Sequence, residues 1–258
     1  MKDFFRNYLD YEIKRIRVRE KYFSIQISSV ILIHVFGNII DLILEVDYKN
    51  NPNLRKAFLR GLFASEGGIG IQSTENYLAY LGFHLSYEKE EKLANFVQEL
   101  LELEGISSKH FTIMNKGERY IQITSWENYW KAYQIKLFDL NQRKKSKFVE
   151  FLNKRRFYCC VNDELKSLIL KDTNKRKLSI LLNRNYNAVS KRMRKNNVES
   201  EDLVKMCLIN QIPLGTLRTN IIGVKTWGSK IIEDKELINF VIDKYLPDKL
   251  KDKKTWLP

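Results

Sequence analysis

Hydrophobic residues recur at helical spacing over residues 52–65, and this pattern predicts an amphipathic helix. A proline at its first position and Gly67 and Gly68 beyond its last turn are typical of a helix start and a helix end. Apolar and polar residues then alternate over residues 68–74 and 77–87, which indicates two strands joined as a hairpin. This stretch is therefore expected to form one helix followed by two antiparallel strands.

The same order of elements recurs directly downstream. Residues 88–104 are rich in Glu, Lys and Leu, with apolar residues at helical spacing up to Gly105, and they predict a helix. Residues 111–115 and 119–124 predict a second hairpin, and residues 126–137 a further helix. The four strands are expected to form one antiparallel sheet with the helices on one face.

The first predicted helix has two faces of different character. One face is apolar, and the other is a stripe with almost no side chain. Such a stripe lets two helix backbones approach closely, so that Glu66 would lie at the bottom of the contact beside its counterpart from another helix. Taken alone, the spacing favours an ordinary amphipathic helix that ends at a glycine. The apolar face holds Phe58, Leu59, Leu62 and Phe63, and the stripe holds Ala57, Gly61 and Ser65.

Positive charge is the second strong signal in the sequence. The 258 residues carry a formal net charge of +14, and residues 141–200 hold 17 Lys or Arg against 5 Asp or Glu, a local excess of +12. Such an excess favours a polyanion as partner, although excess lysine also serves solubility.

The basic stretch lies in a region with a different pattern from the predicted sheet. We expect an N-terminal extension over residues 1–50, a core domain over 51–147 and a basic, mainly helical domain over 148–258. Within the last domain, residues 175–195 read as a helix-turn-helix. Its second helix leaves four side chains free to reach DNA, namely Asn187, Ser190, Lys191 and Arg194.

Several classes of protein and site are disfavoured. Three cysteines, two of them adjacent at Cys159 and Cys160, fit neither a disulfide framework nor a zinc site and indicate a reducing, intracellular compartment. We expect a cytoplasmic protein, with an organelle as an alternative. No signal peptide is visible, and polar residues interrupt the apolar run at 30–46, so a membrane span is not expected. The histidines are too scattered in sequence for a recognisable metal motif.

Residues 59–67, Leu-Arg-Gly-Leu-Phe-Ala-Ser-Glu-Gly, resemble the LAGLIDADG motif letter by letter. The match is carried by Leu59, Gly61, Leu62, Glu66 and Gly67, and the predicted order of helices and strands is the αββαββα core of that fold. The chain is thus similar to LAGLIDADG homing endonucleases with a single complete motif. The resemblance implies an α+β fold with this core, an N-terminal extension of helix and strand, and a mainly helical C-terminal DNA-binding domain.

The resemblance also implies a catalytic centre. It assigns Glu66 to catalysis, and Glu66 with the backbone carbonyl of Ser65 to binding Mg²⁺ or Mn²⁺. One motif supplies half of such a site, so a homodimer is expected, joined through Ala57, Gly61 and Ser65. Family members often place a lysine near Thr124 and a polar side chain near Tyr87, and neither residue here is basic.

The outward face of the predicted sheet is expected to contact double-stranded DNA. Polar, aromatic and basic side chains on a twisted sheet can read base edges in the major groove, although a solvated sheet face would look similar. The outward residues are predicted to be Gln72, Thr74, Tyr80, His84, Thr112, Lys116, Tyr120 and Gln122. The inward residues are predicted to be Ile71, Leu81, Phe83, Ile113, Ile121 and Ile123.

The N-terminal extension has two interpretations. Residues 24–29 match residues 120–125 at a constant offset, with Ile-Gln-Ile identical, so residues 1–46 are either the tail of a first repeat or a separate helix, strand and helix.

Three functions remain open. A site-specific homing endonuclease, mobile with an intron or intein, is the first. A DNA-binding regulator that does not cleave is the second, and a maturase that binds intron RNA is the third.

Overall fold

A computed structural model of the chain describes residues 16–19, 22–25, 45–71, 79–86, 91–113 and 118–247. The chain forms two compact units, Met1–Pro52 and Asn53–Pro258. In the first unit, β1 (Ile16–Arg19) pairs with β2 (Tyr22–Ile25) as an antiparallel hairpin. Most of the stretch that matches residues 120–125, and the remainder of the possible first repeat up to residue 44, lies outside the described residues.

The second unit begins with the predicted order of elements. Helix α4 (Pro52–Ser65) is followed by β3 (Gly68–Ile71) and β4 (Ala79–Ser86), and α5 (Glu91–Leu103) by β5 (Ser108–Ile113) and β6 (Glu118–Ile123). Helix α6 (Trp126–Gln134) completes the series. All strand pairs in this sheet are antiparallel, in the order β3-β4-β6-β5. The predicted α+β fold is therefore confirmed, with β5 beginning three residues earlier than predicted.

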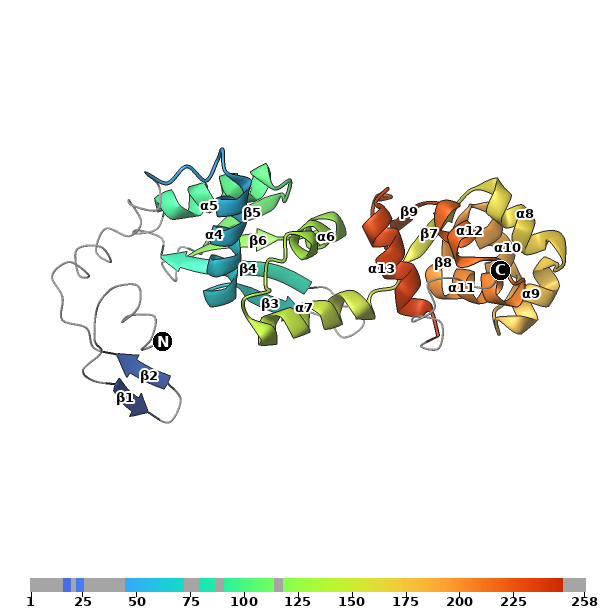
Figure 1. The fold of residues 1–258 in the computed structure, drawn as a ribbon, viewed down its shortest axis with the longest axis horizontal. Coiled ribbons are helices and arrows are strands. Elements are labelled where there is room, and N and C mark those ends of the chain that lie inside the picture. The colour runs from blue at the N-terminus through green and yellow to red at the C-terminus, as the bar shows by residue number, and fades with distance from the viewer. Residues whose placement is uncertain are drawn as a thin grey trace. The chain divides into compact units, whose positions relative to one another are not determined.

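Helices α4 and α5 pack next to this sheet (Figure 1). The ring of Phe63 on α4 lies 5.1 Å from that of Phe83 on β4 and 5.9 Å from that of Phe138, both in edge-to-face geometry. Leu59 and Phe63 are fully buried, as predicted, while Phe58 and Leu62 are half-buried. The motif helix is therefore fixed by one narrow apolar stripe, which leaves its opposite side uncovered.

The rest of the second unit is helical around a small sheet. After α7 (Gln142–Lys154), strands β7 (Tyr158–Val161), β8 (Asn197–Glu199) and β9 (Ile221–Lys225) form an antiparallel sheet in the order β8-β7-β9. This sheet was not predicted. The helices around it are α8 (Asp163–Lys171), α9 (Lys175–Leu181), α10 (Tyr186–Arg194), α11 (Ser200–Ile209), α12 (Leu214–Thr219) and α13 (Lys235–Tyr245).

An aromatic cluster joins α6 to the C-terminal elements. Phe240 on α13 lies 5.6 Å from the rings of both Trp130 and Tyr133, and Phe157 lies 4.9 Å from Trp126. Helix α7 continues across residue 147, where the predicted boundary lies. The division into domains 51–147 and 148–258 stays a prediction. Within the described residues, no helix is long and apolar enough to cross a membrane.

Candidate functional site

The C-terminal end of α4 places Glu66 at the surface. The Glu66 amide donates to the Leu62 carbonyl at 2.9 Å, which closes the last turn, and the Glu66 side chain is exposed. Gly67 follows in a tight position, because a Cβ there would lie 2.4 Å from the Phe63 carbonyl oxygen. The chain can thus turn sharply from the helix into β3 directly after the carboxylate.

The small-residue stripe of α4 is open. Ala57, Gly61 and Ser65 are all exposed, and a Cβ built at Gly61 would meet nothing within 4 Å. The Ser65 hydroxyl donates back to the Gly61 and Leu62 carbonyls at 3.1 and 3.0 Å, so it stays close to its own helix. This surface has the form that a second helix needs for close approach, and the homodimer itself stays a prediction.

Lys144 on α7 is a site residue that the sequence did not reveal. Its ammonium donates to the carbonyls of Phe63, Ala64 and Ser65 at 3.2, 2.8 and 2.8 Å. A lysine in this place satisfies the carbonyls that a helix end leaves without partners, and its charge is favourable there. Burial lowers the pKa of Lys144, while the nearby Glu66 carboxylate opposes that shift.

The residues of one chain do not fit a divalent metal ion on their own. The Ser65 carbonyl, which the family resemblance assigns to the metal, already accepts from the Lys144 ammonium. Across the described ranges, no group of three or more His, Cys, Asp or Glu side chains could hold an ion. A metal at Glu66 would need ligands from a second copy or from a substrate, and it would compete with Lys144 for Ser65.

The outward face of the first sheet agrees with prediction where its side chains are described. Leu81, Ile121 and Ile123 are fully buried and Phe83 almost so, while Tyr120 and Gln122 are half-exposed and His84 is exposed. His84 and Tyr120 are register partners, and their rings lie 4.5 Å apart.

The other residues predicted for this sheet face have no described side chain. Tyr80 and Thr112 lie on β4 and β5, without described side chains. Gln72, Thr74, Tyr87 and Lys116 lie outside the described residues.

The register adds one basic residue to this face. Lys109 is the partner of Gln122 and is exposed. Thr112 is the partner of Arg119 and Ile113 that of Glu118, so the register puts Thr112 in the inward row and Ile113 in the outward row, and both predictions were wrong. The prediction began this strand at residue 111 and therefore missed the lysine. At the end of β6, Thr124 is not basic, and its carbonyl accepts from the Asn128 side chain at 2.8 Å.

Helices α9 and α10 occupy the two spans predicted for the helix-turn-helix. Asn183 takes a positive φ of 51° in the turn between them, and the Asn185 side chain caps α10 by accepting from the Asn187 amide at 2.8 Å. Asn187, Lys191 and Arg194 are exposed and Ser190 is half-exposed. The four residues predicted to reach DNA therefore lie on the accessible side of α10, and their contact with DNA stays a prediction.

Two arginines of this region are used inside the fold. Arg192 donates to Asp202 at 2.6 Å and lies 2.9 Å from Glu199, and Arg184 donates to Asp202 at 3.2 Å. Both carboxylates are buried, so each needs a cation partner. The arginines fasten α10 and the preceding turn to β8 and α11 rather than serving a ligand.

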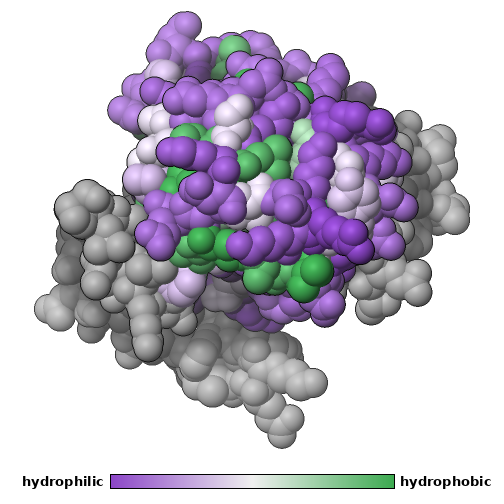
Figure 2. Space-filling model, turned by 90° about the vertical axis from the view of Figure 1, so that its right-hand side faces the viewer, coloured by the Kyte–Doolittle hydropathy of each residue, from purple (hydrophilic) through white to green (hydrophobic). Residues whose placement is uncertain are grey.

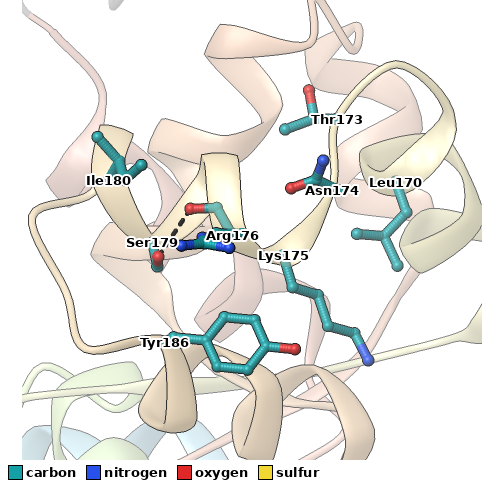
Figure 3. A pocket seen from close by; sticks show the side chains of 8 residues that line it. All are labelled: Leu170, Thr173, Asn174, Lys175, Arg176, Ser179, Ile180 and Tyr186. Atoms are coloured by element: carbon teal, nitrogen blue, oxygen red, sulfur yellow. Dashed lines mark hydrogen bonds between the residues drawn. The ribbon is translucent and has the colours of Figure 1, made fainter.

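A groove of about 990 Å³ opens beside α9 and the start of α10 (Figure 3). Lys175 and Arg176 give it positive charge, and Ile180 and Tyr186 give it apolar surface that is 74% and 49% exposed. Figure 2, which faces the C-terminal region, shows mostly hydrophilic residues with small, separate hydrophobic patches. This composition suits a charged partner better than an extended apolar one.

All three cysteines are buried and free. Burial raises the pKa of Cys159 and of Cys207 to about 12, so these thiols stay protonated at neutral pH. All three pack in the core.

Comparisons with known proteins give one family match and two similar solved structures. Residues 53–135 match the family of LAGLIDADG-like domains. Among solved structures, the chain is similar to mesophilic variants of the homing endonuclease I-DmoI, with 18% identity over 52% of this chain and 68% of that chain and a TM-score of 0.38.

It is also similar to full-length DUF199/WhiA from Thermatoga maritima, with 16% identity over 80% of this chain and 78% of that chain and a TM-score of 0.34. No curated protein matches the chain. The helix-turn-helix is not confirmed by any of these comparisons. The resemblance found in the motif is confirmed by the family match, and residues 53–135 are a LAGLIDADG-like domain.

Proposed function

We propose that this chain is a site-specific DNA endonuclease whose active site forms when two copies bring their α4 helices together. The observation that carries the proposal is the open stripe of Ala57, Gly61 and Ser65, which leads directly to the exposed Glu66 carboxylate. A second α4 on this stripe would put two Glu66 side chains at one contact, one for each DNA strand.

The DNA surfaces of this proposal are the outward face of the first sheet and the exposed side of α10. His84, Tyr120 and Gln122 would meet base edges, with Lys109 beside them for phosphate, because a polar sheet face of this kind fits the major groove. Lys191 and Arg194 on α10 would add contacts to the backbone. Double-stranded DNA is therefore the proposed partner.

A divalent metal ion, Mg²⁺ or Mn²⁺, is the cofactor that the family resemblance implies. When bound beside phosphate, such an ion neutralises charge and activates water. The chain's own contribution is the Glu66 carboxylate and the Lys144 ammonium that lies against the last turn of α4.

A second candidate is a DNA-binding protein that does not cleave. Lys144 favours it, because an ammonium that already satisfies the Phe63, Ala64 and Ser65 carbonyls leaves less demand for a metal ion there. In that case Glu66 would be retained only as the exposed residue that ends the helix.

A cleavage assay distinguishes the endonuclease from the DNA-binding protein that does not cleave. The purified chain is incubated with a pool of randomised duplex DNA and Mg²⁺ or Mn²⁺, beside Glu66→Gln and the control Glu102→Gln, which removes an exposed acid from α5. We expect the wild type and Glu102→Gln to cut the same subset of sequences. Glu66→Gln should bind that subset with cleavage reduced at least a hundredfold, which is the scale of loss when a group that acts on the reacting centre is removed.

Other results would decide against the nuclease. Selective binding without cleavage in any divalent metal supports the second candidate. Cleavage that persists unchanged in Glu66→Gln would show that the active site lies elsewhere, and a preference for folded intron RNA over duplex DNA would favour a maturase.

A further inference from the structure

The turn that follows β9 holds a tryptophan out in solvent. Trp227 is 87% exposed, the highest exposure of any large hydrophobic side chain among the described residues. The turn is built to hold it there: the Ser229 hydroxyl accepts from the Thr226 amide at 2.8 Å, and Gly228 takes a φ of 77°. The tryptophan ring is therefore available for stacking against a flat partner.

A cavity of about 320 Å³ lies beside this ring. It is lined by Tyr158 of β7, Asn197 of β8 and Lys225 of β9 together with the turn itself. Tyr158 and Lys225 are register partners, and the Tyr158 ring lies 6.5 Å from that of Trp227 at an interplanar angle of 56°. The cavity therefore has an aromatic wall, a cationic wall and an open side.

Charge restricts the class of ligand. A tryptophan and a tyrosine also suit a quaternary ammonium group, but Lys225 in the wall and Lys230 just beyond the turn would repel a cation. A ligand with a flat ring and negative charge satisfies the aromatic and lysine groups together. A nucleotide has both.

The position of the turn points to DNA as the source of the nucleotide. A second cavity, of about 660 Å³, shares Thr226, Trp227 and Gly228 and extends to Gln122 and Thr124 at the end of β6. Gln122 belongs to the sheet face that is proposed to contact duplex DNA. A strand that leaves that face would pass the tryptophan.

We propose that Tyr158, Asn197, Lys225 and Trp227 form a pocket for one unpaired nucleotide of a DNA strand. The base stacks on Trp227, and Lys225 lies near its phosphate. A purine presents a larger face for stacking than thymine does, so adenine and guanine bind better than thymine. Extruding a base costs least where it is already unpaired. This inference rests on the proposed DNA-binding function.

The test compares an intact duplex with the same duplex carrying one bulged adenine. The full chain is titrated with both, without divalent metal, by fluorescence anisotropy. We expect the bulged duplex to bind about tenfold more tightly, the scale of stacking one base on an aromatic side chain. Trp227→Ala should abolish the preference, Trp227→Phe should keep most of it, and a bulged thymine should show less of it.

Gln122→Ala serves as the control on the other surface. It should weaken the binding of intact and bulged duplexes alike and leave their ratio unchanged. Because Trp227 is 87% exposed, its replacement by alanine leaves the packed core intact.

The outcomes are distinguishable. Equal affinity for both duplexes in the wild type, or a preference that survives Trp227→Ala, overturns the pocket while leaving duplex binding in place. Binding of adenosine monophosphate that is lost in Trp227→Ala, together with equal affinity for the intact and the bulged duplex, would assign the pocket to a free nucleotide and overturn the DNA source. Failure to bind either duplex would overturn the proposed function first.

Discussion

Helices α4 and α10 are built alike on the inside and differ on the outside. On α4, the buried Arg55 pairs with Glu104 at the end of α5, with an N···O distance of 2.6 Å. On α10, Arg192 pairs with the buried carboxylates of Asp202 and Glu199. Each helix is therefore fastened to its region by an arginine that faces inward, a use of positive charge that net charge alone does not reveal.

The exposed rows of the two helices point to different partners. The row on α4 consists of Ala57, Gly61 and Ser65, which leave room for a backbone and carry no charge. The row on α10 includes Lys191 and Arg194, which offer charge and reach. A stripe without side chains suits another helix, while a basic row suits a polyanion. The comparison implies that α4 joins copies of the chain and α10 binds DNA.

The largest expected effect concerns the inward arginines. Arg192→Met would leave Asp202 and Glu199 buried with Arg184 as their one remaining ion-pair partner among the described residues, and we expect a loss of about 3 kcal/mol in the free energy of unfolding. Arg55→Met would leave one buried carboxylate, Glu104, with Lys56 still 3.8 Å away, so the loss should be smaller. Urea unfolding followed by circular dichroism measures both. Equal losses in the free energy of unfolding would contradict this, because the number of buried carboxylates beside each arginine would then not set its contribution to stability.

A second prediction concerns the exposed row of α4. Gly61→Leu should weaken self-association at least tenfold, because a bulky side chain would separate helices that meet at this position. Gly215→Leu on α12 is the matched control, since a Cβ at either glycine meets nothing within 4 Å and both variants should fold. Sedimentation equilibrium, with and without selected duplex DNA, measures the effect. An unchanged dimer in Gly61→Leu would place the interface elsewhere.

Local signals explain what the sequence could predict. The glycines after α4, the alternation in β4 and β6, and the turn between α9 and α10 each lie within a few residues of the element that they define. Strand β5 begins with Ser108, Lys109 and His110, which lack apolar alternation, so its start was set too late and Lys109 was missed. The second sheet consists of strands of three to five residues, too short to show a period.

Contacts between distant parts of the chain explain what the sequence could not predict. Lys144 lies in the basic stretch that reads as a DNA-binding region, and only the fold brings it to Ser65, 79 residues earlier. Trp227, Tyr158 and Asn197 come from three segments with no common motif, and their pocket exists only once β7, β8 and β9 pair. Residue type indicates the chemistry, but the place where it acts depends on non-local packing.

The smallest expected effect concerns the exposed Lys191 on α10. Lys191→Met should leave the free energy of unfolding within about 0.5 kcal/mol of the wild type, because the side chain is exposed. It should nevertheless weaken DNA binding for all sequences alike and lower the slope of log affinity against log salt by about 1, the loss of one phosphate contact. Lys205→Met on α11 removes the same charge from another surface and should leave the slope unchanged. An unchanged slope in Lys191→Met would contradict the assignment of α10 to DNA, because the exposed lysine would then make no contact with phosphate.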